Sequence, residues 1–94
     1  MRLLSFLKRL NSMALKIKLY GAERCHKTQH YKTFFETRHL DYTFLDVEQN
    51  KDHALELRGL YKNRKLNFPT ITIENKKLRN PNDNELEKWL EKLK

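Results

Sequence analysis

The sequence contains one cysteine, Cys25, at a point where a strand is expected to pass into a helix. Leu15, Ile17 and Leu19 alternate with two lysines just before it, a period-2 pattern typical of a strand with one buried face. Aromatic residues follow at helical spacing, and no Gly or Pro interrupts residues 25–39. At a helix N-terminus, unpaired N–H groups and the helix dipole favour a thiolate. The sequence therefore predicts thiol chemistry. The alternative is a buried structural cysteine.

Charged neighbours strengthen the prediction of a reactive thiol. Arg24 and Lys27 flank Cys25 and favour its charged form, whereas Glu23 opposes them. His26 would act with the two basic residues when it is protonated.

The histidines also invite a metal interpretation. His26 and His30 are four residues apart and can share a helix face next to Cys25. Zinc usually needs three or four ligands, and neither His39 nor His53 has a reason to converge on them. One cysteine also excludes an internal disulfide and a multi-cysteine zinc site. We therefore expect no metal and solvent-facing histidines.

Length and composition indicate one small domain. The 94 residues are enough for a single core, and only two Gly and two Pro predict mostly regular structure. The single cysteine suits a reducing compartment, so a cytoplasmic location is expected. No apolar run approaches the roughly 20 residues needed to span a bilayer, so no transmembrane segment is expected.

The net charge of +8 is unevenly distributed. Residues 1–33 carry eight Lys or Arg against one acidic residue, whereas residues 34–94 carry twelve against eleven. This imbalance favours an anionic partner near the cysteine turn. The basic residues form no continuous run, and no zinc-finger or aromatic RNA-binding signature accompanies them, so no nucleic-acid partner is expected.

Residues 1–14 hold an apolar stripe with basic residues beside it. Lys8 and Arg9 interrupt the stripe and no small-residue cleavage site follows, so the segment is not expected to be a signal peptide. We interpret it as an extension ahead of a domain at residues 15–94. It would be either frayed or a short amphipathic helix on a membrane or on the domain.

Periodicity along the rest of the chain predicts the order β-α-β-α-β-β-α. The expected ranges are strands at about 15–20, 40–47, 71–73 and 76–78, and helices at about 25–39, 51–61 and from the Asn82 cap onward. The expected buried sides of the second and third helices are Ala54, Leu55, Leu57 and Leu60, and Leu86, Trp89, Leu90 and Leu93.

This order, with a cysteine after the first strand and an apolar-Pro-Thr step into the third, resembles the glutaredoxin branch of the thioredoxin fold. The resemblance covers residues 15–93, and its matching stretches are 16–21, Cys25 to Thr28, 40–42 with 46–47, and 68–71. It implies an α/β fold with a mixed four-stranded sheet flanked by helices. It also implies that Pro69 is cis and faces Cys25.

The same resemblance implies thiol–disulfide exchange with Cys25 as the nucleophile. Thr28 stands where dithiol members have a resolving cysteine, so Cys-His-Lys-Thr resembles a monothiol variant. The Thr28 hydroxyl is then expected to hydrogen-bond the Cys25 sulfur. The Cys-Gly-Phe-Ser signature of the iron–sulfur-carrying class is absent, because His26 and Lys27 replace its glycine and phenylalanine.

Glutathione is the co-substrate that the resemblance implies. Phe68 should offer its backbone N–H and C=O to an extended peptide, and Asp83 should pair with the amino group of glutathione. The other expected substrate contacts are Arg24, Lys27, Arg64, Lys65 and Pro69. The usual Gly-Gly before the last helix is Arg79-Asn80 here, so the Arg79 side chain would either fill the groove or grip an anion.

Two function classes remain open. The first is a glutaredoxin-like oxidoreductase that uses Cys25 on glutathione or protein mixed disulfides, and Phe68-Pro69 with the charged cysteine turn favours it. The second is a non-catalytic module of the same fold that binds a protein or a small anion, with a vestigial or regulatory cysteine. The missing second cysteine and missing Gly-Gly favour this second class.

Overall fold

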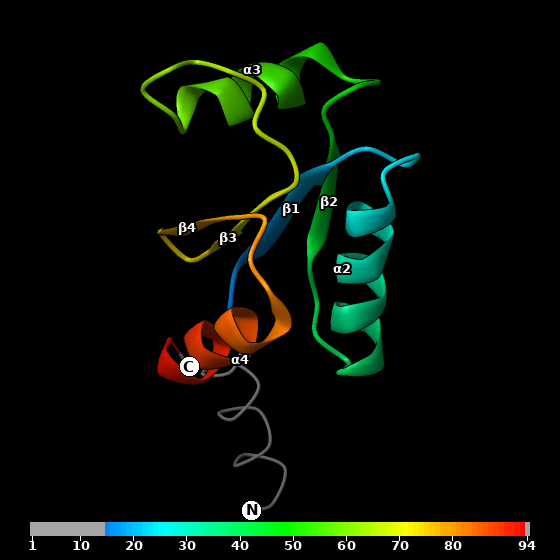
Figure 1. Cartoon of the computed structure of the whole chain (residues 1–94), viewed down its shortest axis with the longest axis vertical. Helices are drawn as coiled ribbons and strands as arrows, with labels where there is room; N and C mark the ends of the chain where they lie inside the picture. Colours follow the sequence, from blue (N-terminus) through cyan, green and yellow to red (C-terminus); the bar gives the residue numbers. More distant parts are fainter. Residues whose placement is uncertain (1–14, 94) are drawn as a thin grey trace, which may run out of the picture.

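The computed structural model describes residues 15–93, and the predicted extension at residues 1–14 lies outside them. The elements, in chain order, are β1 (Ile17–Gly21), α2 (His26–Thr37), β2 (Thr43–Asp46), α3 (Lys51–Gly59), β3 (Thr70–Ile73), β4 (Lys76–Arg79) and α4 (Asp83–Lys92). This order confirms the predicted β-α-β-α-β-β-α arrangement (Figure 1).

The four strands form one mixed sheet in the order β2-β1-β3-β4. β1 pairs parallel to β2 and antiparallel to β3, and β3 and β4 form an antiparallel hairpin. The parallel pair needs a long crossover, which α2 provides. β2 and β4 are therefore the edges of the sheet, and the predicted mixed four-stranded sheet is confirmed.

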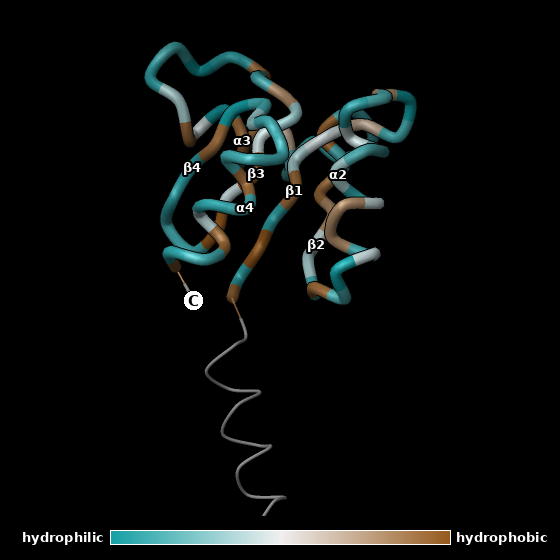
Figure 2. The backbone as a smooth tube through the Cα atoms, turned by 60° about the horizontal axis from the view of Figure 1, so that its bottom comes forward, coloured by the Kyte–Doolittle hydropathy of each residue, from teal (hydrophilic) through white to brown (hydrophobic). Residues whose placement is uncertain are grey.

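Alternating side chains of β1 divide the interior into two clusters, and hydrophobic and hydrophilic residues alternate along this strand in Figure 2. Ile17 and Leu19 point to the face that α2 and α4 cover. The other members of this larger cluster are Tyr31, Phe34, Phe35, Ile71, Ile73, Leu78, Leu86 and Leu90. Tyr20 points to the opposite face and packs with Leu45, Val47 and Leu57 beneath α3.

Of the eight side chains predicted to be buried on the second and third helices, one is exposed and four are half-buried, namely Ala54, Leu60, Trp89 and Leu93. Leu55 is 66% exposed, because α3 turns only Leu57 fully inward and keeps Ala54 half-buried. Trp89 is half-buried at the margin of the larger cluster, where the Lys76 ammonium lies 4.2 Å from its ring centroid.

The first helix ends two residues earlier than predicted. His39 takes a φ of 56°, in the left-handed region. Its N–H donates to the Glu36 carbonyl at 3.1 Å, and the Leu40 N–H donates to the Phe35 carbonyl at 3.0 Å. These two bonds make a Schellman cap, which stops α2 without a glycine. Nothing in residues 15–93 forms a helix long and apolar enough to cross a membrane.

Candidate active site

Cys25 is the residue at which β1 and its turn pass into α2. It is the N-cap of the helix, with an extended backbone at φ −85° and ψ 121°. Its N–H donates to the Ala22 carbonyl at 3.0 Å, and its carbonyl accepts from the Gln29 N–H at 3.1 Å. The thiol is free and partly exposed. The predicted position at a helix N-terminus is therefore the one observed.

The pKa of the Cys25 thiol lies below its ordinary value. Burial is the largest single influence and raises the pKa, but hydrogen bonds acting together outweigh it. The Thr28 hydroxyl and the N–H groups of Thr28 and Lys27 lower the pKa, and the Arg24 charge acts the same way, although the Cys25 side chain makes no capping hydrogen bond. Lys27 thus contributes through its backbone, whereas the sequence suggested its ammonium.

Thr28 is fully buried, and its hydroxyl makes two contacts. Its Oγ1 accepts from the Ala22 N–H at 3.2 Å, which leaves the hydroxyl hydrogen for the Cys25 sulfur. A β-carbon on Gly21 would come within 2.8 Å of the Thr28 methyl carbon. Gly21 therefore makes room for the residue that orients the thiol.

Arg24 and Glu23 both have partners that the sequence did not reveal. Nε of Arg24 donates to the two carboxylate oxygens of Glu48 at 2.9 and 3.1 Å. Glu48 lies in the loop after β2, where its N–H donates to Asp46 Oδ1 at 2.9 Å. The Glu23 carboxylate accepts from Lys32 Nζ at 3.0 Å. Part of the Arg24 charge is consequently neutralised by Glu48.

The segment before β3 contains the predicted cis bond between Phe68 and Pro69. Pro69 is buried, and its carbonyl accepts from the Asn80 N–H at 3.0 Å. Phe68 is half-buried, and its N–H donates to the Leu66 carbonyl at 3.1 Å. The N–H expected to be open to an extended peptide is therefore already used within the loop.

Asp83 is the first residue of α4, and His30 of α2 reaches it. Nε2 of His30 lies 2.8 Å from Asp83 Oδ1, and both side chains are about half exposed, at 55% and 51%. The carboxylate expected to meet a substrate amino group is thus paired with a histidine. The sequence predicted a solvent-facing His30. Asp83 is 53 residues away in the sequence, so no local pattern indicates that the two residues pair.

Tyr31 connects the cysteine end of α2 to the start of α4. Its hydroxyl donates to the Pro81 carbonyl at 2.6 Å and approaches Asn80 Oδ1 at 3.3 Å. Burial raises the pKa of Tyr31 to about 12, and the charges of Asp83 and Cys25 act in the same direction. Cys25 and Asp83 therefore both lie within electrostatic range of one hydroxyl group.

Asn80 and the basic residues complete the surroundings. Asn80 takes a φ of 48°, a conformation that asparagine tolerates better than other residues with a side chain. Arg79 is exposed at the end of β4, and Arg64 and Lys65 are exposed in the loop between α3 and β3. None of these three cations has an ion-pair partner among residues 15–93. The same residues contain no group of three or more His, Cys, Asp or Glu that could hold a metal.

Comparisons with known proteins give the fold. No protein-family model and no curated protein matches the chain. A mutant of the thioredoxin-like protein BC3987 matches in structure with a TM-score of 0.66 and 23% identity, over 80% of this chain and 99% of that one. The glutaredoxin grx-1 of Archaeoglobus fulgidus matches with a TM-score of 0.66 and 11% identity, over 79% and 84%. The chain therefore has a thioredoxin-like fold.

Proposed function

We propose that this chain is a glutaredoxin-like thiol–disulfide oxidoreductase that acts through Cys25 on glutathione or protein mixed disulfides. The observation that carries the proposal is the sulfur at the N-terminus of α2, with donors from Thr28 and the Lys27 N–H around it. These donors stabilise the thiolate, which is the form that attacks a disulfide. The site would operate in a reducing compartment such as the cytoplasm, where external thiol is abundant.

The reaction balances in two exchanges. The Cys25 thiolate attacks the glutathione sulfur of a mixed disulfide, which forms a Cys25–glutathione disulfide and releases the protein thiolate. A glutathione thiolate then attacks that disulfide, which releases glutathione disulfide and restores the Cys25 thiolate. Over the two exchanges, one glutathione thiol enters the cycle and is oxidised, the protein sulfur is reduced, and the glutathione first carried by the substrate leaves as the other half of the glutathione disulfide. The substrate thiolate takes its proton from solvent.

A second cysteine is absent from the sequence, and Thr28 cannot form a disulfide. Cys25 therefore cannot release a trapped substrate by closing a ring within the chain. An external thiol must complete each cycle. We infer a monothiol mechanism, with Thr28 acting as a hydrogen-bond donor to the sulfur.

Glutathione recognition would use groups on both sides of the thiol. Asp83 offers a carboxylate to the substrate ammonium once His30 moves away. The Phe68 carbonyl accepts from the peptide N–H. The cations available for the substrate carboxylates are Arg24, Lys27, Arg64 and Lys65, of which Arg24 must share its charge with Glu48.

The test is turnover of a glutathionylated peptide by the full chain with glutathione as the reductant. We expect multiple turnovers, their loss in Cys25→Ser, and partial retention in Thr28→Ala. Insulin reduction should be poor until external thiol is added. Multiple turnovers of insulin with no more than one equivalent of glutathione would show that the monothiol mechanism is wrong.

The second candidate is a non-catalytic binding module of the same fold. It is favoured by two groups that are already occupied: the Asp83 carboxylate by His30, and the Phe68 N–H by the Leu66 carbonyl. A Cys25 thiol that stays inert toward glutathione disulfide would support this candidate and exclude the enzyme.

A further inference from the structure

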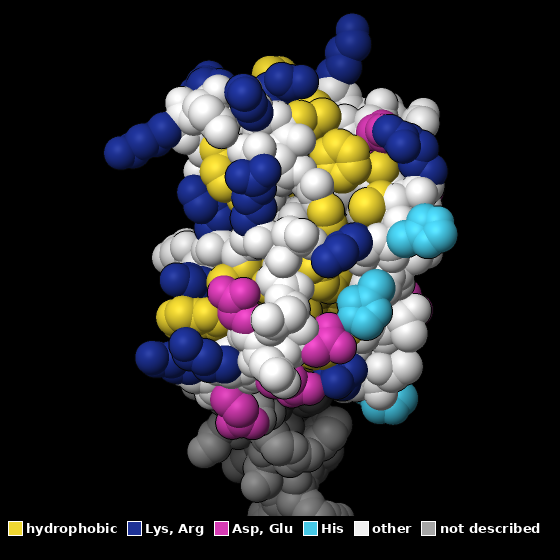
Figure 3. Space-filling model, in the orientation of Figure 1, with side chains coloured by type: hydrophobic (Ala, Val, Ile, Leu, Met, Phe, Trp, Pro, Cys, Tyr) yellow, Lys and Arg dark blue, Asp and Glu magenta, His cyan; other side chains and the backbone are white. Residues whose placement is uncertain are grey.

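Positive charge gathers at a second place, away from the cysteine turn. Residues 58–79 carry seven Lys or Arg and a single acidic residue, Glu74. The exposed members that we call the basic face are Lys62, Arg64, Lys65, Lys77 and Arg79. In Figure 3, Lys and Arg side chains gather at the upper left, where Figure 1 shows β4 and the loop after α3.

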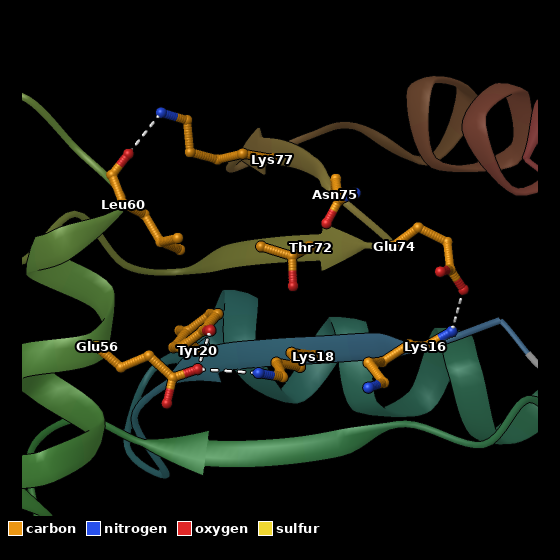
Figure 4. Close-up of a pocket in the computed structure, with 9 residues that line it drawn as sticks. All are labelled: Lys16, Lys18, Tyr20, Glu56, Leu60, Thr72, Glu74, Asn75 and Lys77. Atoms are coloured by element: carbon orange, nitrogen blue, oxygen red, sulfur yellow. Dashed lines mark hydrogen bonds and ion pairs between the residues drawn. The ribbon is translucent and has the colours of Figure 1, made fainter.

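The basic face has no carboxylate to neutralise it within the described structure. Among residues 15–93, every ion pair involves a cation from another part of the chain. Lys77 Nζ donates to the Leu60 carbonyl at 2.8 Å (Figure 4) and lies 4.2 Å from the Tyr61 ring centroid. Both partners are uncharged, so the positive charge of Lys77 remains available to an anionic ligand.

The neighbouring depression, of about 280 Å³, is a weaker candidate. Lys18 lines it, but Glu56 Oε2 already accepts from Lys18 Nζ at 3.0 Å and from the Tyr20 hydroxyl at 2.6 Å (Figure 4). Glu74 also lines it, and its carboxylate accepts from the Lys16 N–H at 2.6 Å. Three lysines and two glutamates line the depression, so its net charge is small, and one of the lysines, Lys77, also belongs to the basic face.

β4 presents backbone groups as well as charge, because it is an edge strand. Ile73 and Lys76 close a two-residue turn, and the Asn80 N–H donates to the Pro69 carbonyl. Hydrogen-bonded and non-hydrogen-bonded residue pairs alternate along an antiparallel pair of strands. Lys77 and Arg79 belong to the non-hydrogen-bonded pairs, so their N–H and C=O groups point away from β3. An extended polypeptide can pair with these groups.

The basic face leads to the candidate active site. Arg79 pairs with Thr70, which directly follows Pro69. The next residue, Asn80, contacts the Tyr31 hydroxyl near Cys25 and Asp83. A polypeptide added along β4 would therefore run toward the thiol.

We propose that the basic face docks an acidic, extended segment of the protein whose mixed disulfide Cys25 reduces. This inference rests on the proposed function and names its substrate class. A polypeptide fits better than a single-stranded nucleic acid, which binds by stacking bases on open aromatic rings. Lys77 covers the Tyr61 ring and Phe68 is half-buried, so the basic face offers no open ring of its own.

The test compares glutathionylated peptides that differ only in an acidic, neutral or basic flank. For the native chain we expect kcat/KM to be about tenfold higher for the acidic than for the basic flank, and this preference to shrink as salt rises. Lys62→Glu/Lys77→Glu should abolish the preference. Lys51→Glu/Lys88→Glu makes the same charge change at exposed positions outside the basic face and should keep most of the preference.

A small mixed disulfide of glutathione and cysteamine separates this inference from the proposed function. If it is turned over while the native chain treats all three flanks alike, the docking inference is wrong and the oxidoreductase stands. If nothing is turned over, fluorescence anisotropy of the labelled acidic peptide still tests docking on the native chain. Tighter binding of a single-stranded oligonucleotide of equal charge would overturn the inference in favour of nucleic acid.

Discussion

Thr28 occupies the space beside Gly21 that any larger residue would need. A β-carbon at position 21 would lie within 2.8 Å of the Thr28 methyl carbon and 3.1 Å of its β-carbon. Such distances are too short for packed carbon atoms. The last residue of β1 and the first turn of α2 are thus fitted to each other, and the fit holds the Thr28 hydroxyl near the Cys25 sulfur.

We therefore predict that Gly21→Ala lowers the free energy of unfolding by about 1–3 kcal/mol, the range for overpacking a core. The same change should slow alkylation of Cys25, because Thr28 must shift. Gly59→Ala is the matched control, since a β-carbon there meets nothing within 4 Å and alanine favours a helix. Denaturant unfolding measures both variants. Equal stability of Gly21→Ala and Gly59→Ala would contradict the packing argument.

The pairing of His30 with Asp83 predicts competition with substrate. His30→Ala should lower KM for a glutathione mixed disulfide several-fold, because the imidazole then no longer occupies the Asp83 carboxylate. Asp83→Asn should raise KM with little change in kcat. Arg38→Ala is the control, because it removes an ion pair that joins the C-cap residue of α2 to Glu87 of α4 at 2.8 Å. A KM that His30→Ala leaves unchanged would rule out competition.

The Tyr31 hydroxyl predicts how stability falls in alkali. Burial raises its pKa in the folded chain to about 12, from an ordinary value of 10.0. Between these values the unfolded chain loses the proton first, so the stability that Tyr31 contributes is complete below pH 10 and declines toward pH 12. Tyr31→Phe should cost about 1 kcal/mol at pH 7 through the lost hydrogen bond to Pro81. Its unfolding free energy should also fall less steeply between pH 10 and 12. An equal slope in both proteins would refute this assignment.

Local patterns predicted the helices, the strands and the position of the thiol, because each of these features depends on residues that are close together in the sequence. Alternation in β1, the uninterrupted segment after Cys25 and the Asn82 cap are of this kind, and Asn82 Oδ1 does accept from the Glu85 N–H at 2.8 Å. The end of α2 was predicted too late, because its left-handed cap residue is His39, and histidine gives no such signal.

Long-range partners could not be found in this way. Glu48 lies 24 residues from Arg24, and no local pattern connects them. Residues 34–94 are nearly neutral when their charges are counted along the sequence, because the acidic residues of α3 and α4 balance the Lys and Arg residues of the basic face. Only the folded arrangement separates the two groups.

The central claim is that Cys25 is an activated thiol, and its rate of alkylation by iodoacetamide against pH tests that claim most directly. Hydrogen bonds from Thr28 and Lys27 should place the midpoint below the ordinary cysteine pKa of about 8.5. Thr28→Ala should move the midpoint upward and Thr28→Ser should largely preserve it, because serine keeps the hydroxyl. A native midpoint at or above about 8.5 would contradict the account.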